Sequence, residues 1–100
     1  MGEVDRYKPI IEFVNSRGHY AYRNSVGARG YRKFGKKGQF DISGVTKKGI
    51  RLEIEVKKDE SEVLSEDQIE FKANMKRCNA IVLVVVTLGD VIAEFNARGL

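Results

Sequence analysis

Three ionisable side chains that could act on one substrate fall on two neighbouring predicted strands. Asp41 lies in a predicted strand over residues 39–45, and Glu55 and Lys57 lie in another over residues 50–57. Glu55 and Lys57 share one face because alternate side chains of a strand point the same way. A turn over residues 46–49 ends in glycine and joins the strands, so the two carboxylates can converge on one spot. Two carboxylates suit a hard divalent ion such as Mg²⁺, and an adjacent ammonium can orient a water, so these residues predict metal-assisted hydrolysis of a phosphodiester.

The charged face of the second strand has another interpretation, a solvated surface with cross-strand ion pairs, which for the strand alone is the commoner arrangement. Asp41 favours the metal site, because it stands between two apolar residues on the adjoining strand. Carboxylates clustered there repel each other and lose hydration, and a bound cation would offset both costs. Glu53, on the same face as Glu55, could bind a second metal. We prefer for it an ion pair with one of three nearby cations, Lys47, Lys48 or Arg51.

Other catalytic constellations are missing from the sequence. The single histidine, His19, and the single cysteine, Cys78, exclude ordinary zinc sites and a Cys/His nucleophile pair. The sequence also contains no glycine-rich phosphate-binding loop that ends in Lys-Ser or Lys-Thr. The carboxylate pair is therefore the strongest candidate for chemistry.

A basic segment precedes the predicted metal site. Residues 17–37 contain seven Lys or Arg residues and no Asp or Glu, with aromatic residues and glycines between them. Cations attract phosphates and glycines let a segment follow a backbone, so this composition favours nucleic acid binding over an ordinary solvated loop. The predicted nucleic-acid-binding residues are Arg23, Arg29, Arg32, Lys33, Lys36 and Lys37.

The composition is that of one small folded domain. The chain has 100 residues, 42% of them apolar, which is enough for a single core over residues 1–100. The longest apolar run, residues 80–88, is less than half the ~20 residues that cross a bilayer, and no signal peptide opens the chain. One cysteine cannot form an internal disulfide, which agrees with a reducing compartment. We therefore expect a soluble cytoplasmic protein that is neither secreted nor bound to a membrane.

The periodicity of apolar residues predicts the order of elements. Helices are expected over residues 3–16, 65–78 and 90–97, and strands over residues 19–26, 39–45, 50–57 and 80–87. Pro9 falls inside the first helix and should kink its first turns or delay its start. The nearly all-apolar last strand must be covered on both faces. The order α-β-β-β-α-β-α predicts an α/β fold in which helices flank a mixed sheet.

Gln68 has two compatible interpretations. Ser65 and Gln68 fit a capping box at the start of the second helix, in which each side chain binds the backbone of the other residue. Gln68 also lies on the apolar stripe of that helix with Phe71 and Met75. A buried amide needs a polar partner, and the nearest carboxylate cluster would be the predicted metal site. We therefore expect Gln68 to contact that site.

The spacing of these residues resembles a known nuclease signature. Asp41 is followed after thirteen residues by Glu55-Val56-Lys57, which resembles the PD-(D/E)XK motif. Within that superfamily the chain is similar to the short stand-alone VRR-NUC (virus-type replication-repair nuclease) domains of phages and bacteria. The similarity covers nearly the whole chain and includes an early Glu in the first helix, Arg23-Asn24, GQFDISG, LEIEVK, LSEDQIEF and AIVLVVV.

The resemblance implies a metal-dependent, structure-specific DNA endonuclease with a PD-(D/E)XK nuclease-like fold. By its pattern, Asp41, Glu55 and the backbone carbonyl of Val56 would hold Mg²⁺ or Mn²⁺. Lys57 would serve catalysis, and Gln68 on the following helix belongs to the same pattern.

The first helix and the start of the motif carry two further implications of the resemblance. Glu3 would be the acid of the first helix that reaches the site, and Glu12 is the competing candidate. The proline that customarily precedes the Asp of the motif is Phe40 here. That proline shapes a turn and binds no metal, so the departure concerns the local backbone rather than the chemistry.

The expected substrate is branched DNA, because contacts to phosphates carry no base information and so recognise shape. A four-way (Holliday) junction takes two symmetric cuts and therefore two sites, and the resemblance implies the homodimer that would supply them. Two alternatives stay open: a non-catalytic nucleic-acid-binding module, and a nuclease subunit that is active only with a partner. The first predicts DNA binding that survives EDTA without cleavage, and the second predicts that the purified chain is inert.

Overall fold

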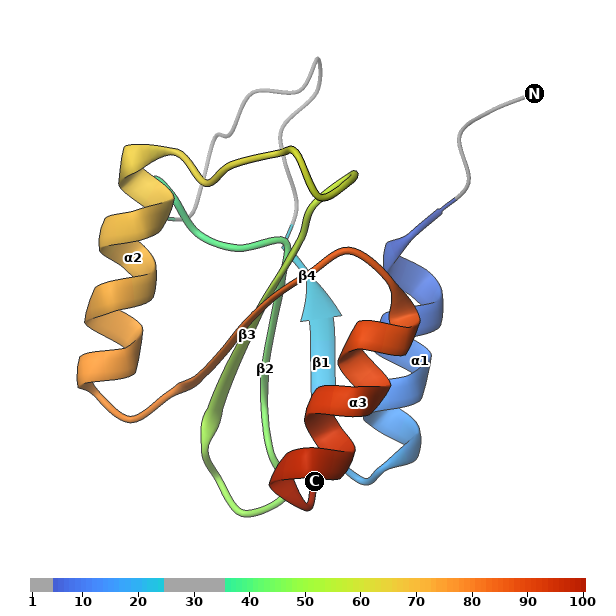
Figure 1. Ribbon diagram of the computed structural model, residues 1–100. Helices are drawn as coiled ribbons and strands as arrows, with labels where there is room; N and C mark the ends of the chain where they lie inside the picture. The colour runs from blue at the N-terminus through green and yellow to red at the C-terminus, as the bar shows by residue number, and fades with distance from the viewer. Residues whose placement is uncertain (1–4, 25–35) are drawn as a thin grey trace.

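The computed structural model describes residues 5–24 and 36–100 (Figure 1). Its helices are α1 (Tyr7–Ser16), α2 (Glu66–Arg77) and α3 (Leu88–Arg98), and its strands are β1 (Tyr20–Arg23), β2 (Ile42–Val45), β3 (Arg51–Val56) and β4 (Ile81–Val85). The predicted order α-β-β-β-α-β-α is confirmed for this part of the chain. Within the same ranges, no helix has the length and apolar character needed to cross a membrane.

The four strands form one mixed sheet in the order β1-β2-β3-β4. β1 pairs antiparallel with β2, and β2 pairs antiparallel with β3 through a turn in which Gly49 adopts a φ of +87°. β3 and β4 are parallel, so the chain must cross over between them, and α2 lies in that connection. Figure 1 shows α2 on one face of the sheet and α1 with α3 on the other. The predicted mixed sheet flanked by helices is therefore confirmed.

Several elements begin at residues other than those predicted. The strand expected over residues 39–45 begins at Ile42, and Phe40 instead packs its ring against Phe71 under α2. α1 begins at Tyr7, which leaves Pro9 in the first turn, where a missing N–H breaks no helical hydrogen bond. α3 begins at Leu88 rather than residue 90, because the residue before it starts a capping box.

β3 divides its side chains between the two faces of the sheet. Its three apolar side chains are buried in the larger core under α1 and α3, as the alternation in the sequence predicted. Glu53 and Glu55 point to the opposite face, where Phe40, Phe71 and Val82 form a smaller core under α2. Both glutamates are buried, at 0% and 7% exposure. Burying ionised groups is unfavourable unless they are paired, so each of the two needs its own explanation.

Candidate active site

The predicted metal ligands lie where β2 separates from β3. Backbone pairing between these strands ends at Ile42 opposite Ile54, and side chains take over beyond that point. The Asp41 N–H donates to Glu55 Oε1 at 3.2 Å, and the Val56 N–H donates to Asp41 Oδ2 at 2.9 Å. Asp41 therefore precedes β2 instead of lying on it as predicted, because a carboxylate has replaced the backbone partner of its amide.

Asp41 and Glu55 form a buried pair of carboxyl groups. They lie close enough to share one proton, which Glu55 donates to Asp41 when Glu55 is protonated. Burial raises the pKa of Asp41. Burial, and then the charge of Asp41, raise the pKa of Glu55 to about 7. The pair therefore holds negative charge that is poorly hydrated and self-repelling, and a divalent cation would relieve both effects.

The oxygen atoms around this pair fit a hard divalent cation. The Val56 N–H uses only the Oδ2 atom of Asp41. The Val56 carbonyl faces the same gap as its N–H, because both groups of a strand residue point to one side. Two carboxylates, a carbonyl and water are the ligands that Mg²⁺ and Mn²⁺ accept. No group of three or more His, Cys, Asp or Glu that could hold a metal occurs in the described ranges, so water or Glu3, outside them, would complete the set.

The raised pKa of Glu55 predicts a stability that depends on pH and on metal. The pKa of Glu55 is about 7 in the folded chain and ordinarily 4.5, so between these values the folded chain binds more protons than the unfolded chain. The contribution of Glu55 to the free energy of unfolding should therefore fall as pH rises from about 4.5 to about 7, and Mg²⁺ should reduce that fall. Melting temperatures of wild type and Glu55→Gln, measured across this range with EDTA or Mg²⁺, report the titration of Glu55 together with its effect on Asp41. Identical pH profiles for the two proteins in EDTA would contradict the prediction.

Gln68 joins the start of α2 to the carboxylate pair. The predicted capping box is present: the Gln68 N–H donates to Ser65 Oγ at 3.2 Å, and the Ser65 N–H donates to Gln68 Oε1 at 3.0 Å. The amide nitrogen Nε2 of Gln68 donates to Glu55 Oε2 at 2.9 Å. The two interpretations of Gln68 therefore hold together, since the cap fixes the amide oxygen and thereby directs the nitrogen at Glu55.

Asn24 fixes the backbone on either side of Asp41. Its N–H donates to the Asp41 carbonyl at 2.8 Å, and its side-chain amide donates to the Phe40 carbonyl at 2.6 Å. The same amide donates to Ser43 Oγ at 2.8 Å, and the Ser43 hydroxyl donates to Glu53 Oε1 at 2.9 Å. The resemblance included Asn24 without a role, and these bonds show that it holds the Asp41 segment against β1 and β2.

Glu53 forms the ion pair that was preferred for it. Its second oxygen accepts from Arg51 Nε at 2.5 Å, so the predicted ion pair is confirmed, and Arg51 is the partner among the three cations considered. Burial raises the pKa of Glu53, and hydrogen bonds from Arg51 and Ser43 oppose the rise. Both carboxylate oxygens are engaged by donors, which argues against a second metal at this position.

Lys57 follows β3 directly, and its N–H donates to the Val85 carbonyl at 2.7 Å. Its side chain lines a cavity of about 320 Å³ at the end of β4, together with acidic side chains of α3. Hydrogen bonds from two backbone N–H groups hold the pKa of Asp90 below its usual range, and the charge of Lys57 adds to this. Among the described residues no ion pair joins Lys57 to Asp41 or Glu55. The structure thus brings the two carboxylates together and places the amine beside a neighbouring cavity.

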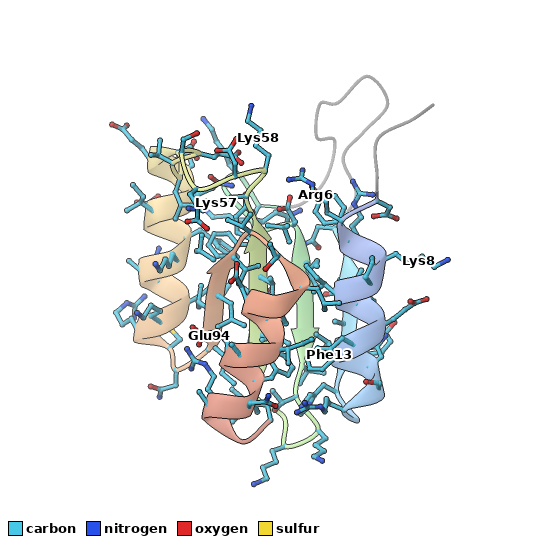
Figure 2. The ribbon with its side chains drawn as sticks, turned by 45° about the vertical axis from the view of Figure 1, so that its right-hand side comes forward. Arg6, Lys8, Phe13, Lys57, Lys58 and Glu94 are labelled. Atoms are coloured by element: carbon cyan, nitrogen blue, oxygen red, sulfur yellow. The ribbon has the colours of Figure 1, made fainter. Side chains whose placement is uncertain are left out.

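Residues at the start of α1 approach the carboxylate pair and were not predicted from the sequence. Burial, and then the charge of Asp41, raise the pKa of Tyr7. The charges of Arg23 and Arg6 oppose the burial that raises the pKa of Asp41. Figure 2 shows Arg6 at the same end of the molecule as Lys57. Only the packing of α1 against β1 brings these residues together, so spacing along the chain could not indicate it.

Comparison with known proteins bears on the fold. No protein family model matches this sequence, and no curated protein matches it. A solved structure described as a VRR_NUC domain matches with a TM-score of 0.69 and 22% sequence identity, over 90% of this chain and 89% of that chain. The chain has the VRR-NUC fold. The fold that the resemblance implied is therefore confirmed, and the activity has to be argued from the site, because one fold hosts many activities.

The resemblance implied that an acid of the first helix reaches the metal site, with Glu3 preferred and Glu12 as the competing candidate. Glu3 lies outside the described residues. Glu12 is exposed on α1 and makes no hydrogen bond or ion pair with any residue in the ranges that the structure describes. Glu3 therefore stays the preferred prediction for this role.

Only three of the six basic residues predicted to bind DNA lie in the part of the chain that the structure describes. Arg29, Arg32 and Lys33 lie outside the described residues, whereas Arg23 ends β1 and Lys36 and Lys37 precede the Asp41 segment. Lys37 pairs with Asp67 at 3.5 Å on the surface, and exposed pairs of this kind are weak enough to exchange for a phosphate. Gly38 follows at a φ of +82°, and a side chain there would collide with the Asp67 carbonyl, so glycine lets this segment cross the first turn of α2.

Proposed function

We propose that the chain is a metal-dependent endonuclease that hydrolyses phosphodiester bonds in DNA. The convergence of Asp41 and Glu55 where β2 leaves β3 carries this proposal, because two buried carboxylates that repel each other fit a divalent cation. The VRR-NUC fold supports a nuclease over other chemistry that uses a carboxylate-bound metal.

Mg²⁺ or Mn²⁺ would be held by Asp41, Glu55 and the Val56 carbonyl, and when bound would acidify a water and offset charge on a phosphate. Gln68 anchors the Glu55 carboxylate through its Nε2 bond and so orients the remaining lone pairs of that carboxylate. Asn24 anchors the backbone of Asp41 from the other side. Asp41 and Glu55 are therefore positioned before any substrate arrives, by hydrogen bonds from Asn24 after β1, Val56 of β3 and Gln68 of α2. This preorganisation favours catalysis.

Lys57 would act as the cation beside the reacting phosphate. Its long flexible stem begins two residues after Glu55, and its charge acts on Asp90 across the adjoining cavity. A phosphate placed at the carboxylate pair would compete with Asp90 for this ammonium. Once turned to the phosphate, Lys57 would stabilise the negative charge that develops there in the transition state.

The proposed substrate is branched DNA, including four-way junctions cut by a homodimer. Arg23, Lys36 and Lys37 flank the Asp41 segment, and Arg29, Arg32 and Lys33 belong to the same basic segment of sequence. Contacts from these side chains to phosphates would select the shape of the DNA rather than its bases. One site makes one cut, so symmetric resolution of a junction needs two copies of the chain related by a two-fold axis.

Incubation of labelled linear, nicked, flap and four-way-junction DNA with Mg²⁺, Mn²⁺ or EDTA tests the proposal. We expect cutting that requires metal and favours the branched DNAs. DNA binding that survives EDTA, with no cutting of any DNA in either metal, would support the non-catalytic module instead. Inactivity that an added partner protein reverses would support the subunit alternative.

A further inference from the structure

Arg6, Tyr7 and Arg23 form a stack beside the carboxylate pair. The Arg23 Cζ atom lies 4.0 Å from the centre of the Tyr7 ring, and the Arg6 Cζ atom lies 5.6 Å from it. Both distances are within the range of cation–π attraction, so one ring holds two guanidinium groups. Arg6 immediately precedes α1, Arg23 ends β1, and both charges act on Asp41.

The hydrogen-bonding capacity of these two guanidinium groups is not used within the described chain. Neither makes a hydrogen bond or an ion pair with a residue in the ranges 5–24 and 36–100, and Arg6 Nη1 is buried without a partner there. By contrast, Arg17, Arg51 and Arg98 each bind an acceptor of the chain. A buried donor without an acceptor is unfavourable, so any rearrangement or ligand that brings an acceptor oxygen to Arg6 Nη1 would be favoured.

Among the described residues, the nearby acid Asp5 acts on Arg23 through its charge but forms no ion pair with it. Asp5 Oδ1 accepts the N–H groups of Tyr7 and Lys8, at 2.8 and 3.2 Å, and so serves the start of α1. Asp41 attracts both arginines through its charge. A divalent cation on the carboxylate pair would balance the charge of Asp41 and so weaken its attraction for Arg6 and Arg23, which would favour another anion there.

We propose that Arg6 and Arg23, held in place by Tyr7, bind a DNA phosphate adjacent to the one that is cut. This inference rests on the proposed nuclease function and adds a binding subsite to it. Planar guanidinium groups suit the ligand, because they donate paired N–H groups to phosphate oxygens. The same oxyanion chemistry is offered by an internal phosphodiester and by a terminal 5′-phosphate.

DNA binding measured by fluorescence anisotropy in Ca²⁺, a divalent cation that can balance the charge of the carboxylate pair, tests the subsite separately from the rate of cutting. Arg6→Gln and Arg23→Gln should each weaken binding of the best-cut branched DNA by about tenfold or more. Each should also reduce the slope of log affinity against log salt by about 1. Tyr7→Leu should weaken binding because it removes the ring, whereas Tyr7→Phe should bind like wild type because it keeps the ring.

Arg77→Gln is the matched control, since it removes one positive charge at the far end of α2. Equal losses with 5′-phosphate and 5′-hydroxyl ends would place an internal phosphate in the subsite, and losses confined to phosphorylated ends would place a terminal one there. If wild type cuts DNA while Arg6→Gln and Arg23→Gln bind like Arg77→Gln, the subsite is wrong and the nuclease stands. If wild type neither binds nor cuts DNA, both proposals are wrong. Melting temperatures confirm that each variant is folded.

Discussion

Removing either acid of the carboxylate pair, as Asp41→Asn or Glu55→Gln, should lower the rate of DNA cutting by about 10³-fold or more. Loss of a bound cation removes charge stabilisation worth several kcal/mol in the transition state. Both substitutions keep the shape of the side chain: Asp41→Asn keeps an oxygen for the bond from Val56, and Glu55→Gln keeps one of the two oxygens that bind the Asp41 N–H and Gln68, so the fold should survive. Single-turnover cutting, beside DNA affinity and melting temperature, measures the separate effects on chemistry, binding and folding.

Glu53→Gln is the matched control for these substitutions. Glu53 is buried on the same strand and face as Glu55, but its oxygens bind Arg51 and Ser43. Its substitution should therefore lower the melting temperature and leave most of the cutting rate. Wild-type cutting by both Asp41→Asn and Glu55→Gln would remove the carboxylate pair from the chemistry.

Substitution of Lys57 by methionine should lower the single-turnover rate by about 10²- to 10³-fold, with a much smaller effect on DNA affinity. Methionine preserves the apolar stem, and the N–H that binds Val85 is unchanged, so β3 and β4 should stay paired. The rate should fall because Lys57 follows β3 directly and is half-buried, whereas the next cation, Lys58, is exposed. Rapid-quench cutting of DNA bound in advance separates this effect from affinity.

Lys58→Met controls for the loss of charge alone. Lys58 is the next residue and is exposed, and Figure 2 shows both lysines at the same end of the molecule. Its substitution should weaken DNA binding slightly and leave unchanged the rate at which bound DNA is cut. Equal rate losses in the two variants would mean that Lys57 contributes only general attraction to DNA.

The elements that carry the site were predictable because their information is local. The alternation over residues 50–57 gives a strand with opposite faces, and the structure buries both faces. The capping box from Ser65 to Gln68 is a pattern of four adjacent residues, and its geometry directs the Gln68 amide toward Glu55. Pairing of the two strands then brings Asp41 and Glu55 together.

Other features depend on contacts between distant segments and left no local pattern. Asp41 lies ahead of β2 because the Glu55 carboxylate accepts its N–H. That bond joins residues 14 positions apart, so the strand propensity of the residues around Asp41 does not predict it. The stack of Arg6 and Arg23 on Tyr7 forms only when α1 packs on β1. The cavity beside Lys57 forms where β4 passes into α3, far along the chain from β3.

Calorimetric titration of Mn²⁺ into metal-free wild type and Asp41→Asn tests the metal site most directly. At about pH 8, where Glu55 is ionised, we predict that wild type binds Mn²⁺ and that Asp41→Asn binds it at least about tenfold more weakly. Absence of Mn²⁺ binding by wild type, or equal binding by the two proteins, would contradict a cation held between Asp41 and Glu55.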